Sequence, residues 1–275
     1  MFLKRHIKSL AWHGIKAFSA LAPVPASVQA QITTVSVFTL HRVLPGAQGE
    51  LAVTPEQAEQ WLRQIAQRYR VLSGDVFLHP PADRKPLALI TVDDAFSDAH
   101  DHLWPLLQAL RVPVVLFVPT GFIDSGNPPI SFAVDRSQYR PCTWEQLRSM
   151  AASPWITLGA HSHAHLEVQT QDADALAVDT EHCLRRFAEE GLPRPRLYAY
   201  PRGKFTPEAA RVLGSFFDAG FAGAPHHGLG GELSRMAWPR VPLRGSDAGF
   251  WGRRKIRTGT SQEEYWVERI KGGLK

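Results

Sequence analysis

The sequence is poor in cysteine: Cys142 and Cys183 are its only two, and they lie far apart and outside any CxxC pattern. A scaffold held by disulfides and a zinc site built on thiolates are therefore excluded. Since a chain of 275 residues buries enough apolar surface to need no such crosslinks, we expect both cysteines to be packing residues.

Long apolar runs, internal repeats and low-complexity linkers are also missing. No stretch reaches the roughly 18 apolar residues that a membrane-spanning helix needs. The absence of repeats favours one domain over a solenoid or an array. The sequence thus predicts a single domain over residues 32–275, preceded by a distinct segment over residues 1–31.

A strong charge of one sign is absent as well. The net charge is +5, from 31 basic and 26 acidic residues, and most of the excess lies near the two ends. A nucleic-acid groove would instead interleave basic residues with stacking aromatics across one face. We expect no nucleic-acid partner; weak attraction to anionic lipid or polysaccharide and plain solvated termini both fit the pattern. The charge pattern does not indicate the oligomeric state.

The segment 1–31 is basic and mixes apolar residues at loosely helical spacings. Trp12, His13 and Lys16 interrupt the apolar centre that a signal peptide requires. We expect a peripheral amphipathic helix over residues 2–19 that contacts a membrane surface. This favours a cytoplasmic protein or one peripheral at the inner membrane, although the small-residue ending Val28-Gln29-Ala30 leaves export open.

Short β-branched runs alternate with helical patterns beyond residue 32, which is typical of an α/β fold with a parallel sheet. The strand-like runs are Thr33 to Leu40, Leu87 to Val92, Val112 to Val118, Trp155 to Ala160, Arg196 to Tyr200, Gly220 to Gly223 and Met236 to Val241. Several are almost continuously apolar, as in strands buried on both faces. The pattern predicts an α/β barrel.

Capping signals predict the helices between these strands. Thr54, Thr143 and Thr206 each stand where an N-cap residue precedes a helical pattern, and Gly191 follows one as a C-terminal stop. Residues 97–110 also have a helical pattern, in which Pro105 predicts a kink or a shifted first turn.

Two adjacent carboxylates, Asp93 and Asp94, follow the apolar run Leu87 to Val92. Parallel α/β folds place active-site loops at such strand ends. Two acids so close raise each other's pKa unless a cation or a proton separates their roles. The pair therefore suggests one metal ligand and one base, while an N-cap before a helix is the structural alternative.

Three histidines, His161, His163 and His165, follow another apolar run and have no acidic residue among them. If the chain turns helically here, His161 and His165 at i and i+4 converge on one metal ion. Histidine with carboxylate is a common ligand set for zinc and other divalent metals. We therefore expect a metal site that combines these histidines with the Asp pair.

These motifs resemble those of the polysaccharide deacetylases of carbohydrate esterase family 4. Thr91-Val92-Asp93-Asp94-Ala95 is similar to the family's TFDDG motif, and His161-Ser162-His163-Ala164-His165 to its H-[ST]-x-x-H motif. The resemblance spans about residues 34–243. It implies a deformed (β/α)7 barrel, with Asp93 as the general base that activates a water molecule and Asp94, His161 and His165 as ligands of a divalent metal, zinc above others.

The third motif of the family is less faithful. Ala199-Tyr200-Pro201-Arg202-Gly203 resembles the A-Y-P-Y-G form of poly-N-acetylglucosamine deacetylases, with Arg202 in place of the tyrosine. The resemblance implies that the backbone N–H of Arg202 helps to hold the oxyanion, a duty that does not depend on the side chain. The family arginine that braces the base is replaced by Ala199. Arg240 or Arg196 is the candidate substitute, with a surface position as the alternative for each.

The late L-x-H motif, which supplies a catalytic acid in typical members, has no convincing counterpart, because His226 and His227 lie in a glycine-rich stretch. His41 ends an early strand-like run and resembles the Y-H-R-V segment of deacetylases with circularly rearranged strands. The resemblance implies that His41 is the acid, with packing at a strand end as the alternative.

The resemblance as a whole implies a metal-dependent hydrolase that removes N-linked acetyl groups from a sugar in a glycan, glycolipid or lipid-linked saccharide. The departures at Ala95, Ala199 and Arg202 keep a second hypothesis open, a carbohydrate-binding barrel without turnover. An esterase or deformylase that uses the same site is a third.

Overall fold

The computed structural model describes residue 14 and residues 35–127, 139–223, 231–261, 263 and 266. The membrane-contacting helix that the sequence predicts over residues 2–19 lies outside these residues, apart from Gly14. So do His226 and His227. Within the described residues, no helix combines the length and the apolar character needed to cross a bilayer.

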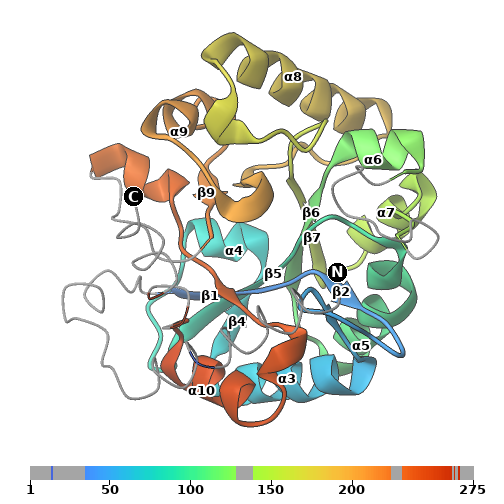
Figure 1. Cartoon of the computed structure of the whole chain (residues 1–275), viewed down its shortest axis with the longest axis vertical. Helices are drawn as coiled ribbons and strands as arrows, with labels where there is room; N and C mark the ends of the chain where they lie inside the picture. Colours follow the sequence, from blue (N-terminus) through green and yellow to red (C-terminus); the bar gives the residue numbers. More distant parts are fainter. Residues whose placement is uncertain are drawn as a thin grey trace.

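A curled parallel sheet occupies the centre of the molecule, with helices around it (Figure 1). Its strand order is β10-β1-β5-β6-β7-β8-β9, and every neighbouring pair is parallel. The strands are β1 (Val35–Leu40), β5 (Leu87–Val92), β6 (Val114–Val118), β7 (Ile156–Ala160), β8 (Leu197–Ala199), β9 (Ala219–Phe221) and β10 (Val241–Pro242). This arrangement confirms the deformed (β/α) barrel.

The barrel is deformed beside β5. One edge of β5 pairs with β1 over its whole length, whereas the other edge is shared. The short strand β4 (Arg70–Leu72) pairs with the beginning of β5, and β6 pairs only with its end, at Thr91 and Val92. β4 is therefore inserted between β5 and β6 at one end of the barrel. A separate parallel pair, β2 (Arg42–Val43) and β3 (Ala52–Val53), follows β1.

The strand predicted over Met236 to Val241 is wrong in this form. Met236 ends a 3-10 turn, Gly231–Met236, and Trp238 forms only a parallel bridge to Phe221 of β9. Val241 then pairs with Phe38 of β1. The chain thus passes from the last strand of the sheet to the first, and Pro239, which has no N–H to donate, stands between the two pairings.

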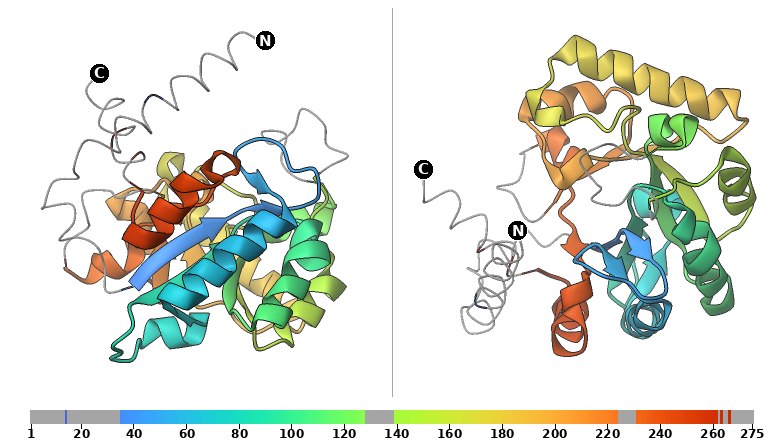
Figure 2. Two further views of the ribbon diagram at one scale, coloured as in Figure 1. Left: turned by 90° about the horizontal axis from the view of Figure 1, so that it is seen from below. Right: turned by 45° about the vertical axis from the view of Figure 1, so that its right-hand side comes forward.

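The longer helices cover the outside of the sheet in Figures 1 and 2, whereas the short helix α4 lies near the centre of Figure 1, within the curve of the sheet. The longer ones are α3 (Pro55–Arg68), α5 (Trp104–Leu110), α7 (Trp144–Ala151), α8 (Ala173–Glu189), α9 (Pro207–Leu213) and α10 (Phe250–Thr258), with α4 (Gly74–Leu78) and α6 (Thr120–Ser125) as shorter ones. Thr54, Thr143 and Thr206 accept the N-cap hydrogen bonds that the sequence predicts.

The helical pattern of residues 97–110 has the shifted first turn that Pro105 predicts: a π-helical turn at Ala99–Leu103 precedes α5, which begins at Trp104. Pro105, in the first turn of α5, lacks the N–H that a continuous α-helix would use there, which accounts for the wider turn.

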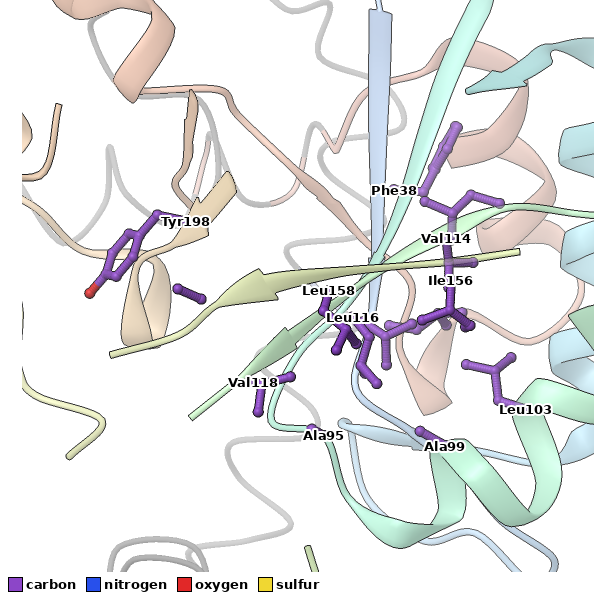
Figure 3. Close-up of a cluster of buried hydrophobic side chains, with 14 of the residues drawn as sticks. Phe38, Ala95, Ala99, Leu103, Val114, Leu116, Val118, Ile156, Leu158 and Tyr198 are labelled. Carbon is purple, nitrogen blue, oxygen red and sulfur yellow. The ribbon is translucent and has the colours of Figure 1, made fainter. Parts of the chain in front are cut away.

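Side chains alternate between two apolar layers along the central strands. Val35, Val37, Leu87, Leu89, Val115 and Phe117 belong to the cluster inside the barrel. Phe38, Val114, Leu116, Val118, Ile156 and Leu158 point the other way, into the larger cluster beneath the helices that Figure 3 shows. Both cysteines are buried, in agreement with a packing role.

Candidate active site

The inward alternation continues past the ends of three strands and brings polar side chains to one mouth of the barrel. Val35 and Val37 share their parity with His41, Leu87 and Leu89 with Asp93. Gly159 of β7 lies against Phe117 and is followed two residues later by His161. Because all these strands run parallel, their carboxyl ends gather His41, Asp93 and His161 in one place.

Asp94 joins this group through a sharp turn. Asp94 and the following Ala95 have positive φ angles of 73° and 47°, a backbone conformation that residues with a Cβ rarely adopt. The turn aims the Asp94 carboxylate at two imidazoles, with its Oδ1 atom 3.5 Å from Nε2 of His161 and 3.5 Å from Nε2 of His165. All three side chains are buried.

The ligand atoms of Asp94, His161 and His165 lie within 4.8 Å of one another, as a shared metal ion requires. No described residue hydrogen-bonds the buried Oδ1 atom of Asp94. Nδ1 of His161 donates to the carbonyl oxygen of Ala199 at 2.8 Å, since a carbonyl only accepts. Neutral His161 therefore directs the lone pair of Nε2 at the carboxylate, and this contact is favourable only with a cation or a proton between them. The three residues fit a divalent metal.

The pKa values agree with an anionic carboxylate here. Burial raises the pKa of Asp94, but the proximity of the His161 and His165 imidazoles lowers it by more, so the net shift is downward. Burial lowers the pKa of His161, but Asp94 and Asp93 raise it above its usual value. The site attracts positive charge.

His161 and His165 converge without the helical turn that would have brought them together at i and i+4. Ser162 and His165 have φ angles of 68° and 54°, so the loop turns through left-handed conformations. Asp179 of α8 holds this shape: its carboxylate accepts hydrogen bonds from the Ser162 hydroxyl and from the backbone N–H groups of His163 and Ala164, at 2.8, 2.9 and 2.9 Å. This role of Asp179 was not predicted from the sequence. The only local signal for it is that an acidic residue occurs on the helix that follows the histidines.

His163 does not point at the metal site. Its Nδ1 atom lies 2.8 Å from the Thr120 hydroxyl, and its ring stacks on His182 with centroids 3.7 Å apart. Burial, with the neighbouring His182, lowers the pKa of His163. The contacts of His163 with Thr120 and His182 therefore anchor the loop to its surroundings.

Asp93 has a fixed cation of its own. Nη1 of Arg240 donates to Oδ1 of Asp93 at 2.7 Å, and Nε of Arg240 donates to the carbonyl oxygen of Ala222 at 2.9 Å. Arg240 is only 4% exposed, so it is not a surface residue. Burial raises the pKa of Asp93, but the charge of Arg240, aided by His161 and His41, brings it below its usual value.

His41 lies on the other side of Asp93. Its Nε2 atom is 3.8 Å from Oδ2 of Asp93, beyond a direct hydrogen bond, and its side chain is 23% exposed. Burial lowers the pKa of His41, against the opposing effect of Asp93 and Asp94. The next residue, Arg42, is fixed by Asp98, which accepts from Nε of Arg42 at 2.8 Å.

Of the other arginines, Arg202 has a positive φ of 59° in the 3-10 turn Pro201–Gly203. Its side chain is 47% exposed and pairs with Glu167, so only its backbone is oriented by the turn. Arg196 pairs with Asp218 on the surface and takes no part in the site.

A pocket of about 310 Å³ opens beside these residues. His41, Asp94 and Phe96 form its inner end, and Glu50, Leu51 and Tyr139 are among its outer lining. The guanidinium of Arg42 lies 4.5 Å from the ring centre of Tyr139 and 5.1 Å from that of Phe96, which stiffens one wall. Asp94 and His41 thus line the same pocket.

Residues 81–216 match the sequence profile of the family described as polysaccharide deacetylase. The chain belongs to the polysaccharide deacetylase family. The match includes Asp93, Asp94, His161, His165 and Arg202, whereas His41 and Arg240 lie outside it. No curated protein matches the chain.

Solved structures of deacetylases share the fold. The Streptococcus pyogenes deacetylase PplD in complex with acetate is 15% identical, with a TM-score of 0.68 over 82% of this chain and 98% of that one. IcaB from Ammonifex degensii is 20% identical, with a TM-score of 0.65 over 82% and 97%. The BpsB deacetylase domain from Bordetella bronchiseptica is 18% identical, with a TM-score of 0.60 over 76% and 95%.

Proposed function

We propose that this protein hydrolyses the N-acetyl group of a sugar in a glycan, glycolipid or lipid-linked saccharide, with the help of a divalent metal ion. Membership of the polysaccharide deacetylase family supports this reaction class. The observation that carries the proposal is the contrast between two adjacent carboxylates. Asp93 is paired with Arg240 at 2.7 Å, whereas Asp94 faces two imidazoles and has an oxygen that no described residue hydrogen-bonds.

Asp94, His161 and His165 would hold the metal, which we expect to be zinc, and when bound it would polarise the acetamide carbonyl and acidify a water molecule. Ala199 orients His161 through its carbonyl oxygen, and Asp179 shapes the loop that carries both histidines. These contacts prepare the two histidines for binding.

Asp93 acts as the general base. Arg240 occupies its Oδ1 atom, so Oδ2 is the atom left to take the proton of the attacking water. Since the pKa of Asp93 is below its usual value, the carboxylate is ionised at neutral pH and ready to accept that proton.

His41 acts as the general acid. An amine anion is a very poor leaving group, so the nitrogen must receive a proton as the C–N bond breaks. His41 stands 3.8 Å from Oδ2 of Asp93 and lines the pocket, and this position supports the role. The backbone N–H of Arg202 would donate to the negative charge that develops on the carbonyl oxygen.

The reaction adds the elements of water across the amide: OH goes to the acyl carbon, the proton goes to nitrogen, and acetate and an amino sugar leave. The test is to incubate metal-loaded protein with a panel of N-acetylated glycans and to measure acetate and new amine in the same samples. We expect both in equal amounts, and neither from an Asp94→Ala variant.

Other outcomes would replace the proposal. Glycan binding without acetate would identify a carbohydrate-binding protein that lacks turnover. Acetate release from esters alone would identify an esterase, and release of formate in place of acetate would identify a deformylase.

A further inference from the structure

Helix α10 has one face that belongs to the fold. Gly252, Lys255 and Ile256 are buried. A Cβ at Gly252 would stand 2.5 Å from the Trp61 side chain of α3, so the two helices are in close contact there. The ammonium of Lys255 is neutralised by Asp247 at 2.6 Å. The positive charge of Lys255 is thus used inside the molecule.

The opposite face of α10 is different in kind. Phe250, Arg253, Arg254 and Arg257 follow one another at i, i+3, i+4 and i+7, so they share one side of the helix. Phe250 is 57% exposed, and the exposed residues of this face include Arg253 and Arg257. Trp251 stands at its border, with its ring 5.1 Å from that of Phe250. We call Phe250, Arg253, Arg254 and Arg257 the outer face of α10.

The outer face is basic and carries no acid. The helix sequence FWGRRKIRT contains no Asp or Glu. Within the described parts of the chain, neither Arg253 nor Arg257 forms an ion pair with a carboxylate. Two positive charges that no described carboxylate pairs with, at Arg253 and Arg257, next to the exposed ring of Phe250, suit an anionic partner with an apolar interior.

We propose that the outer face of α10 docks on an anionic lipid bilayer. The arginines would attract anionic headgroups, and the Phe250 ring would enter the headgroup boundary, where aromatic side chains are favoured. The face is the side of a helix, a convex shape that suits a broad membrane surface better than the groove-bound chain of a glycan.

The active-site pocket lies next to the turn that precedes α10. Gly245, in the 3-10 turn Gly245–Asp247 just before α10, donates its N–H to the carbonyl oxygen of Glu50 at 3.0 Å. The Ser246 hydroxyl donates to the Glu50 carboxylate at 2.6 Å. Glu50 lines the pocket, so the pocket is in direct contact with the turn that leads into α10. This inference does not depend on the proposed reaction.

The test is sedimentation of the full chain with vesicles of phosphatidylcholine, and with vesicles in which about one third of it is replaced by phosphatidylserine. Two double variants are compared with the wild type. Arg253→Gln with Arg257→Gln removes two charges from the outer face, while Arg185→Gln with Arg211→Gln removes two from the exposed sides of α8 and α9. Figures 1 and 2 show α8 and α9 on the far side of the sheet from α10.

We expect binding to the phosphatidylserine vesicles that weakens as salt is raised. Each arginine contributes roughly five-fold in partitioning, so the α10 double variant should bind on the order of 30-fold more weakly than the wild type. The control double variant should bind like the wild type. Phe250→Ala should weaken binding at every salt concentration, because it removes an apolar contact. Deacetylation of a soluble glycan should be unchanged in all these variants.

Three results would overturn the proposal. They are equal binding to both kinds of vesicle, an α10 double variant that binds as well as the wild type, and a control double variant that loses as much affinity as the α10 variant. Binding to an anionic polysaccharide with no binding to vesicles would assign the outer face to that polymer instead.

Discussion

Asp93 and Asp94 are adjacent in the sequence, chemically identical and both buried, yet their surroundings differ. Asp93 is neutralised by a cation that belongs to the fold, the guanidinium of Arg240 at 2.7 Å. Asp94 is surrounded by two imidazoles at 3.5 Å, neither of which carries a permanent charge. The difference accounts for the two roles that we propose. A carboxylate paired with a fixed guanidinium can act as a base, whereas a carboxylate that faces only neutral imidazoles can act as a ligand of a removable cation.

The largest effect should come from the Asp94 side. His161→Ala or His165→Ala removes one of three metal ligands, so bound metal should fall and acetate release should drop to background. His163→Ala is the matched control, because His163 lies between them in sequence but bonds Thr120 and stacks on His182. Metal analysis and acetate release measure both. Either ligand variant with full metal content and wild-type turnover would refute the ligand assignment.

The Asp93 side can be probed through His41. A general acid contributes about 10²- to 10⁴-fold, so His41→Ala should lower turnover of an N-acetyl substrate by about that factor with its metal retained. An aryl acetate ester has a leaving group that hardly needs a proton and should be affected much less. Parallel kinetics on the two substrates make the comparison, and equal losses would point to a structural role for His41.

The fixed cation can be removed from Asp93 by Arg240→Met. A buried charge without its partner typically costs about 3–5 kcal/mol, and we expect the free energy of unfolding to fall by about that amount. Adding Asp93→Asn should recover part of the loss, because it removes the unpaired charge. Denaturant unfolding measures both.

The control for Arg240 is Arg196→Met, which breaks an exposed ion pair with Asp218 and should cost less than about 1 kcal/mol. Equal losses for the two arginines would mean that Asp93 does not depend on Arg240 for its charge balance.

A smaller effect on metal affinity is expected from Asp179, which holds the loop that carries His161 and His165. Asp179→Asn keeps the shape of the side chain but turns one acceptor into a donor, so it can accept from the N–H of His163 or from that of Ala164 but not from both. Outer supports of metal ligands are typically worth about 10- to 100-fold in affinity, and we expect a loss in that range by metal titration. Asp174→Asn, an exposed change on the same helix, should leave affinity unaltered. A metal affinity of Asp179→Asn equal to that of the wild type would contradict the role of Asp179 in positioning the loop.

The strands that the sequence predicted best are those buried on both faces. Leu87 to Val92 has the predicted bounds, because six consecutive buried residues leave a clear apolar run. The run Met236 to Val241 was mispredicted because its apolar residues serve two different strands, with Trp238 at β9 and Val241 at β1. A local pattern does not reveal which neighbour each residue will meet.

The candidate site follows the same rule. The residues that led us to expect a metal site lie close together in the sequence. They are the Asp pair and the three histidines. The contacts that distinguish their roles come from far away: Arg240 is 147 residues from Asp93, and Asp179 is 16 residues from His163. The left-handed turns at Ser162 and His165 depend on such contacts, so no spacing could predict them.

The most direct test of the central contrast is metal titration of two variants that differ only in which carboxylate is lost. Asp93→Asn and Asp94→Asn each remove one charge with almost no change of shape, one residue apart. We predict that Asp94→Asn lowers zinc affinity by a factor on the order of 100 or more, while Asp93→Asn binds zinc within about ten-fold of wild type but releases no acetate. Zinc loss in Asp93→Asn with retention in Asp94→Asn would contradict the account and reverse the two roles.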